Sequence, residues 1–87
     1  MYLLDLRAKI KDKFHKMEKK DKNQLDIINK KVLQIREDPH RFKPLSNIMK
    51  GLRRIHFGSF VLTYSIDEQN KTVILEDYDH HDKIYRK

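Results

Sequence analysis

The spacing of apolar residues changes at Gly51, and this change limits the folds that the chain can adopt. Before Gly51, apolar side chains recur every three or four residues, which is the period of an amphipathic helix. After Gly51 they alternate with polar residues or form short runs rich in β-branched and aromatic types, which is typical of strands. Helices followed by a sheet predict an α+β fold. With 87 residues, there is room for one small core, so residues 1–87 are expected to form a single domain.

Two amphipathic segments precede the change of period. The first runs from Leu6 to Met17, with apolar residues separated by 4, 4 and 3 positions. The second begins after Asp21, a residue type that favours the helix N-cap, and ends before Pro39. Its apolar stripe consists of Leu25, Ile28, Val32 and Ile35. A tight turn between the two segments predicts a helical hairpin, while residues 2–6 could form either a short strand or the first helical turn.

Three segments after Gly51 are predicted to be strands, at residues 52–57, 60–66 and 72–78, and residues 40–51 are predicted to be a loop. If Gly58 and Ser59 form a two-residue turn, Phe57 faces Phe60 and one face of the hairpin is mainly apolar. That face should pack on the helices. The opposite face, which carries Arg54 and His56, is expected to be polar and cationic. The sequence therefore predicts a helical hairpin packed on an antiparallel sheet.

The chain is basic, with 20 Lys and Arg against 13 Asp and Glu and a net charge of +7. All of the excess lies in residues 1–50. Such a charge favours a polyanionic partner, most often nucleic acid, although a solvated lysine-rich surface explains it equally well. Cysteine is absent, which excludes disulfides and thiolate chemistry. No apolar run reaches the length of a signal peptide or membrane span, so we expect a cytoplasmic protein without membrane contact.

Two adjacent histidines, His80 and His81, stand out in the C-terminal segment. Neighbours on extended chain point to opposite faces and no second pair of ligands reinforces them, so we expect no metal and no other cofactor. Imidazoles titrate near neutral pH, which suits them to general acid–base catalysis or to phosphate contact. The alternative is that either histidine is a structural hydrogen-bonding group or is merely solvated. A functional role is favoured if one of them converges with Arg54, His56 and Tyr85 on one face.

The ordered motifs in the second half of the chain resemble those of the RelE/ParE toxin superfamily. They are Pro44-Leu45, Gly51-Leu52-Arg53-Arg54-Ile55, Gly58-Ser59-Phe60, the segment Tyr64-Ser65-Ile66-Asp67 through Lys71, and the segment from His80 to Tyr85. Two helices before the sheet are also the arrangement of that family. The resemblance implies a first strand at residues 2–6. The chain departs from the family pattern at Val61, where an arginine is common, and at His80-His81-Asp82.

The resemblance implies one of two activities. RelE-like toxins are ribosome-dependent mRNA endonucleases that inhibit translation and are neutralised by an antitoxin, whereas ParE-like toxins poison DNA gyrase. We therefore expect a toxin that cleaves RNA without a metal, with a non-catalytic or ParE-like binding protein as the alternative. The implied partners are the ribosome, mRNA and a small acidic antitoxin. Whether the complex with antitoxin also contacts operator DNA stays open.

The catalytic positions that the resemblance implies are Arg54, His56 and Tyr85, joined by His80 or His81. Metal-free RNA cleavage needs a base for the 2′-hydroxyl, a cation for the phosphate and an acid for the leaving oxygen. Arg54 would clamp the phosphate, His56 and one C-terminal histidine would divide the acid and base roles, and Tyr85 would stack on a base or orient the hydroxyl. Further RNA contacts are expected from Arg53, Lys83, Arg86, Lys9, Lys13 and Lys16.

Overall fold

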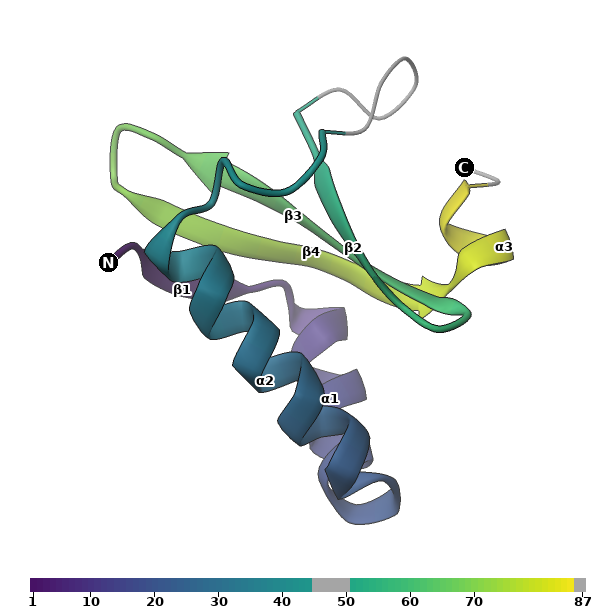
Figure 1. The fold of residues 1–87 in the computed structure, drawn as a ribbon. Coiled ribbons are helices and arrows are strands. Elements are labelled where there is room, and N and C mark those ends of the chain that lie inside the picture. The colour runs from purple at the N-terminus through teal and green to yellow at the C-terminus, as the bar shows by residue number, and fades with distance from the viewer. Residues whose placement is uncertain (45–50, 86–87) are drawn as a thin grey trace.

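The computed structural model describes residues 1–44 and 51–85. Along the chain lie β1 (Leu3–Leu6), α1 (Ala8–Lys20), α2 (Lys22–Glu37), β2 (Arg53–Phe57), β3 (Phe60–Asp67), β4 (Thr72–His80) and α3 (His81–Tyr85). The hairpin of α1 and α2 lies on one side of the sheet, and α3 continues from the end of β4 (Figure 1). The predicted α+β class and helical hairpin are confirmed. Positions 45–50 of the predicted loop, and Arg86, lie outside the described residues.

The helices form where the apolar periodicity predicts them. The Asp21 carboxylate accepts a hydrogen bond from the Gln24 backbone N–H at 3.2 Å, which caps the first turn of α2. The helix ends at Glu37, two residues before Pro39, because proline disfavours helical geometry in the residue before it. The four residues of its predicted stripe are buried. In α1, Ile10 is the fully buried position that faces the sheet.

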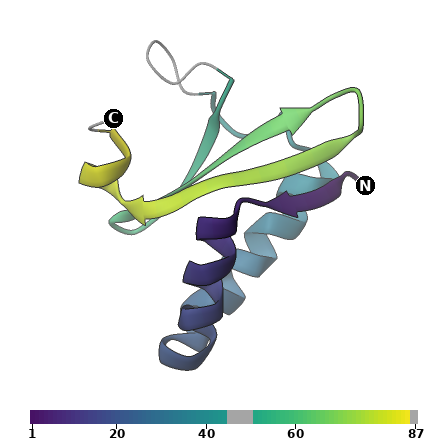
Figure 2. The same cartoon turned by 180° about the vertical axis from the view of Figure 1, so that it is seen from behind.

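The sheet has the strand order β1-β4-β3-β2. Strands β2, β3 and β4 form the predicted antiparallel meander, and Phe57 pairs with Phe60 across the Gly58-Ser59 turn as expected. Residues 3–6 adopt the strand alternative and pair in parallel with β4, which Figure 2 shows from behind. The sheet is therefore mixed: β1 and β4 run in the same direction, whereas the other neighbouring strands run in opposite directions.

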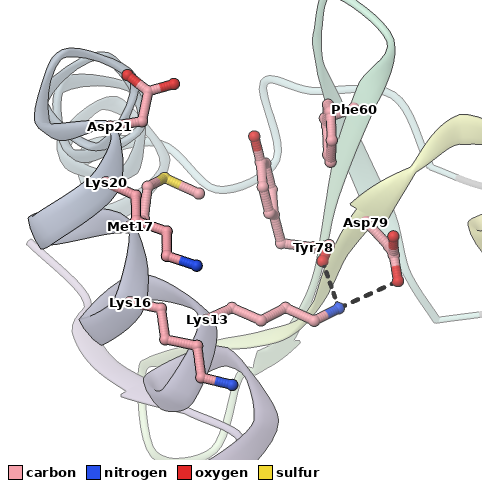
Figure 3. Close-up of a pocket in the computed structure, with 8 residues that line it drawn as sticks. All are labelled: Lys13, Lys16, Met17, Lys20, Asp21, Phe60, Tyr78 and Asp79. Carbon is pink, nitrogen blue, oxygen red and sulfur yellow. Dashed lines mark hydrogen bonds and ion pairs between the residues drawn. The ribbon is translucent and has the colours of Figure 1, made fainter.

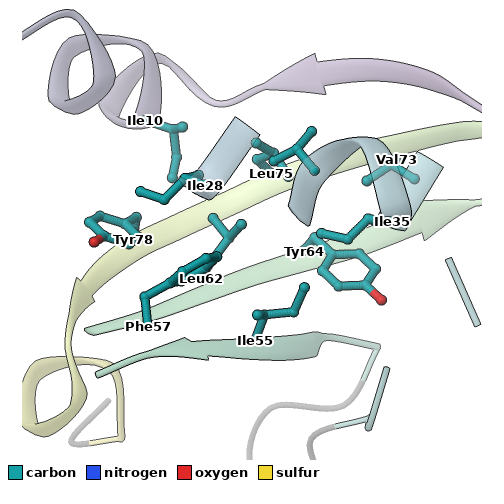
Figure 4. Packing of buried hydrophobic residues seen from close by; sticks show 11 residues of the cluster. Ile10, Ile28, Ile35, Ile55, Phe57, Leu62, Tyr64, Val73, Leu75 and Tyr78 are labelled. Atoms are coloured by element: carbon teal, nitrogen blue, oxygen red, sulfur yellow. The ribbon is translucent and has the colours of Figure 1, made fainter. Parts of the chain in front are cut away.

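The core lies between the helical hairpin and one face of the sheet. Its central members are Ile10, Ile28, Ile35, Ile55, Phe57, Leu62, Tyr64, Val73, Leu75 and Tyr78 (Figure 4). Tyr64 is fully buried, and its hydroxyl donates to the Pro39 carbonyl at 2.7 Å. Burial raises the pKa of Tyr64 to about 12, so this phenol stays a hydrogen-bond donor at every physiological pH.

The opposite face of the sheet is less open than the sequence predicts. Val61 and Thr63 alternate with the core residues of β3, so their side chains point away from the helical hairpin, yet both are buried. The short helix α3 packs against β3 and β4, and its Ile84 is fully buried. This face carries Arg54 and His56 as expected, and the C-terminal segment folds back over part of it. The edge of this covered area carries the candidate site.

Candidate active site

Arg54 is the centre of a polar cluster on the face that α3 covers. Arg54 and His56 are two residues apart on β2, so their side chains lie on the same face of the strand. Arg54 Nη1 lies 2.5 Å from His56 Nε2 and donates to the Tyr85 hydroxyl at 3.0 Å. Because a guanidinium has no acceptor, His56 Nε2 must accept, which places the imidazole proton on Nδ1. The strand and α3 thus bring together a cation, a neutral imidazole and a phenol.

The ionisation of His56 fits the role of a base. Desolvation lowers the pKa of His56 below its ordinary value of 6.5, and the nearby charges of Arg54 and His81 lower it further. The imidazole is therefore unprotonated at neutral pH. An unprotonated imidazole beside a guanidinium can take a proton from a hydroxyl while the cation binds the neighbouring anion.

His81 joins the cluster through the geometry of α3. It is the first residue of that helix and Tyr85 follows four residues later, so both side chains lie on the same helix face. The His81 ring centroid is 4.7 Å from that of Tyr85 and 6.1 Å from that of His56. The Asp82 carboxylate lies 3.4 Å from His81 Nδ1. His81 is therefore the C-terminal histidine that accompanies Arg54, His56 and Tyr85.

His80 lies apart from the cluster. It is the last residue of β4, it pairs with Phe60, and its ring centroid is 5.8 Å from the Phe60 ring. Its Nδ1 accepts from the Asp82 backbone N–H at 3.2 Å, which supports the first turn of α3. The two histidines are separate as expected, but the reason is that β4 ends and α3 begins between them, and not that they are neighbours on one extended strand. The contacts of His80 match the alternative of a structural hydrogen-bonding group.

One buried nitrogen of Arg54, its Nε, has no hydrogen-bond partner among the described residues, 1–44 and 51–85. Buried donors are nearly always paired in folded proteins, so an unpaired one at a candidate site calls for an explanation. A phosphate oxygen reaching this guanidinium would supply the missing acceptor after a small rotation of the side chain.

Two of the lysines expected to contact RNA form ion pairs within the protein. Lys9 and Lys13 form ion pairs with the Asp77 carboxylate at 3.2 and 3.3 Å. Lys13 also pairs with Asp79 at 3.2 Å and donates to the Tyr78 carbonyl at 2.6 Å. Their ammonium groups therefore fasten α1 to the end of β4.

The other predicted RNA contacts differ in their surroundings. The Arg53 guanidinium donates to the Phe42 and His40 carbonyls at 2.7 and 3.3 Å, which ties β2 to the segment after α2. Lys16 and Lys83 are exposed, on α1 and α3 respectively. In the part of the chain that the structure describes, no group of three or more His, Asp or Glu side chains is placed to hold a metal ion. No helix in that part is long and apolar enough to span a membrane.

Ile84 supports this region and was not among the predicted site residues. It is the fully buried residue of α3, and its contacts with the sheet position the helix that carries His81 and Tyr85. The signal was present as a lone aliphatic residue in an otherwise polar C-terminal segment. It was missed because the segment was treated as extended chain.

Several solved structures of bacterial toxins have this fold. The YoeB/ParE toxin from Agrobacterium tumefaciens superposes with a TM-score of 0.81 at 14% identity, covering 91% of this chain and 98% of that chain. The isolated Escherichia coli RelE toxin gives 0.78 at 16% identity, covering 92% and 84%. The toxin–antitoxin complex RelBE2 from Mycobacterium tuberculosis gives 0.76 at 23% identity, covering 91% and 96%. At these identities the likeness establishes a RelE-like toxin fold.

Sequence relatives place the chain more closely. Residues 3–85 match the family described as ParE toxin of type II toxin-antitoxin system, parDE. The putative toxin RelE4 of Methanocaldococcus jannaschii is 41% identical over 88 residues, covering 100% of this chain and 94% of that protein. An uncharacterized protein of Methanosarcina mazei is 52% identical over 86 residues, covering 98% and 100%. The chain belongs to this ParE toxin family of type II toxin–antitoxin systems, within the RelE/ParE superfamily.

Proposed function

We propose that this toxin is a ribosome-dependent mRNA endonuclease that cleaves RNA without a metal ion. The observation that supports this activity best is the contact of one guanidinium, Arg54, with both the imidazole of His56 and the hydroxyl of Tyr85. These are the chemical groups that a metal-free transesterification needs, and they come from two elements of the same face. In this proposal the ribosome supplies the mRNA in the conformation that the reaction needs.

The reaction would proceed by attack of a ribose 2′-oxygen on the adjacent phosphorus. His56 Nε2 would take the 2′-hydroxyl proton once Arg54 turns from the imidazole to the phosphate, and Arg54 would stabilise the charge that develops on the phosphate oxygens. The bond from phosphorus to the 5′-oxygen breaks, and the leaving oxygen takes a proton from His81 in its imidazolium form. Products would be a 2′,3′-cyclic phosphate and a 5′-hydroxyl. Tyr85 would hold Arg54 in place or stack on a base.

Val61 does not contribute a cation in this mechanism. It pairs with His56 across β2 and β3 and is fully buried, so its role is to support the strand under the imidazole. Arg54 is then the main source of positive charge at the reacting phosphate. This arrangement predicts a strong dependence of the rate on Arg54.

We further propose that a small acidic antitoxin neutralises this toxin. The RelBE2 structure from Mycobacterium tuberculosis is described as a toxin–antitoxin complex, and the family is defined by such pairs. The net charge of +7 suits an acidic partner. A stable complex should bury about 1,600 Å² or more of surface.

A second candidate function has its own support. The matched family is named for ParE, and the chain has Val61 where RelE-like nucleases commonly have arginine. In that case the protein would act by binding DNA gyrase and would not need the Arg54–His56–Tyr85 cluster for chemistry.

One experiment separates the two candidates. Purified toxin is added to translating ribosomes with a defined mRNA, to the same mRNA without ribosomes, and to gyrase with relaxed plasmid. Cleavage only on ribosomes, with 5′-hydroxyl ends and in the presence of a metal chelator, supports the nuclease. Inhibition of supercoiling with intact mRNA supports the ParE-like candidate and contradicts the first.

A further inference from the structure

A groove lies between α1, the first residue of β3 and the last residues of β4. Its volume is about 310 Å³, and it is lined mainly by apolar atoms (Figure 3). The lining residues that matter for its chemistry are Lys13, Lys16, Met17, Lys20, Phe60 and Tyr78. None of them belongs to the Arg54 cluster, so the groove needs an explanation of its own.

An exposed aromatic ring forms one wall of the groove. Phe60 stacks on Tyr78, with ring centroids 5.3 Å apart and an interplanar angle of 15°. Tyr78 belongs to the core, but Phe60 is 41% exposed. Met17 faces these rings from α1 (Figure 3). The groove therefore joins one exposed aromatic ring to a partly buried methionine, which forms an apolar surface that a partner can cover.

Two exposed lysines line one rim of the groove. Lys13 is occupied by its ion pairs with Asp77 and Asp79. Lys16 and Lys20 are exposed, lie one helical turn apart on the groove side of α1, and have no ion-pair partner within the described ranges. The groove thus offers an apolar floor with a row of two lysines along one rim, which is the arrangement of an interface core and its polar edge.

We propose that this groove is the docking site for an acidic, amphipathic segment of the antitoxin, an inference that rests on the proposed antitoxin partner. Apolar side chains of the segment would pack between Phe60 and Met17, and its carboxylates would pair with Lys16 and Lys20. RNA fits this surface less well. The floor is lined mainly by apolar atoms, which suit apolar side chains and offer few hydrogen-bond donors to a phosphate backbone.

The groove and the candidate active site lie on opposite faces of the sheet. Phe60 and Tyr78 point to the side of the helical hairpin, whereas Arg54 and His56 point to the side of α3. Losing the groove should therefore free the toxin from its antitoxin without disabling it. This separation makes the proposal testable independently of the nuclease activity.

The test measures the affinity of the full-length toxin for its purified antitoxin, taken from the same operon, by isothermal titration. Lys16→Glu/Lys20→Glu and Phe60→Ser alter the groove. Lys11→Glu/Lys19→Glu makes the same charge change on the same helix, and Leu33→Ser removes a similarly exposed apolar side chain from α2. We expect each groove variant to weaken binding about tenfold or more, with controls within about twofold, because a few central residues dominate an interface. Ribosome-dependent cleavage by Phe60→Ser should remain, because Phe60 lies on the face of the sheet away from Arg54.

Compensating charge changes in the antitoxin test whether its carboxylates pair with Lys16 and Lys20. Antitoxin variants with Lys in place of single Asp or Glu residues should restore binding to Lys16→Glu/Lys20→Glu and not to wild type. Equal losses in the groove and control lysine variants would reduce the effect to diffuse charge and overturn the proposal, as would unchanged affinity in all variants. Loss of ribosome binding with intact antitoxin affinity would assign the groove to RNA instead. Wild-type toxin that binds no operon partner would overturn the antitoxin proposal itself.

Discussion

Arg54 Nη1 and the Tyr85 hydroxyl meet at 3.0 Å although 31 residues separate them in the sequence. This hydrogen bond joins an edge strand, β2, to the short C-terminal helix α3. It orients the guanidinium beside His56 and depends on α3 staying in place. The proposed chemistry therefore depends both on the charge of Arg54 and on the docking of a five-residue helix.

Replacing Arg54 should abolish most of the cleavage activity. Arg54→Ala removes the cation that faces the phosphate, and loss of one such group commonly lowers the rate about 100-fold or more. Arg54→Lys keeps the charge but cannot contact His56 and Tyr85 with a fork of donors, so it should recover only part of the rate. The measurement is single-turnover cleavage on ribosomes. Arg41→Ala, an exposed arginine outside the site, is the matched control; a fully active Arg54→Ala would remove Arg54 from the mechanism.

The two adjacent histidines should behave differently when each is replaced by asparagine. His81→Asn should slow cleavage about 10-fold or more, because general acid catalysis typically contributes at least that much. His80→Asn should leave the rate nearly unchanged, since His80 contacts Phe60 and the first turn of α3. Comparable losses in both variants would show that the effect comes through the fold of the C-terminal segment. Circular dichroism of both variants provides the control for folding.

The acid limb of the pH–rate profile should report His56. Desolvation first, and then the charges of Arg54 and His81, hold the pKa of His56 below 6.5, so the base form persists as the pH falls below that value. Activity should be lost only when the pH passes through this lowered pKa. In His81→Asn, the pKa of His56 should rise towards 6.5, measured by NMR titration of the ring protons. A His56 pKa above 6.5 in the wild-type protein would contradict its assignment as the base.

The fold follows largely from local sequence signals, while the site depends on tertiary contacts. The Asp21 cap, the stripe from Leu25 to Ile35 and the pairing of Phe57 with Phe60 are encoded within a few residues of one another, and each was predicted. The parallel pairing of β1 with β4 was not, because residues 2–6 carry no signal for a partner about 70 positions away. By contrast, the register of the β2–β3 hairpin follows from local signals, and it correctly predicts that Arg54 and His56 lie on the same face of β2.

The choice between His80 and His81 lies beyond such local rules. It is decided by where β4 ends and α3 begins, and the polar C-terminal segment has too little periodicity to fix that boundary. The same holds for Lys9 and Lys13. Nothing in the spacing of these lysines shows that Asp77 and Asp79 on β4 will take up their charges. Residue types alone therefore overestimate the number of basic side chains left for RNA.

Removing the Lys13 ammonium should destabilise the protein. Lys13→Met keeps the length of the side chain but leaves the buried Asp77 carboxylate with fewer partners, at a cost of about 1–3 kcal/mol in the free energy of unfolding. Lys11→Met, at an exposed position of the same helix, is the control. Urea denaturation of both variants at neutral pH measures the difference. Equal stability of Lys13→Met and wild type would show that the remaining partners of Asp77, which include Lys9 and the Tyr78 backbone N–H, satisfy its carboxylate.

The same variant should change how stability depends on pH. Burial alone would raise the pKa of Asp79, but the His80 backbone N–H and the Lys13 ammonium outweigh it, so the pKa is lowered. A carboxylate with a lowered folded-state pKa stabilises the protein at neutral pH, and this contribution is lost as the pH falls through that pKa. Lys13→Met should therefore lose less stability than wild type on acidification. A parallel decrease in both proteins would mean that Lys13 does not act on Asp79.

Truncating Ile84 should disconnect the site from the sheet without unfolding the domain. Ile84 is fully buried where α3 packs against β3 and β4, and a helix of five residues has little stability of its own. An aliphatic-to-alanine change at such a position costs about 2–5 kcal/mol, which exceeds what so short a helix can lose while staying docked. In Ile84→Ala, α3 should detach and take Tyr85 away from Arg54. Hydrogen exchange should show fast amides in residues 81–85 and protected amides in β3 and β4, and cleavage should fall at least about tenfold.

The control is Ile84→Val, which keeps most of the buried surface and should keep both the docking of α3 and the cleavage activity. Full activity with a detached α3 would show that Arg54 and His56 suffice without His81 and Tyr85.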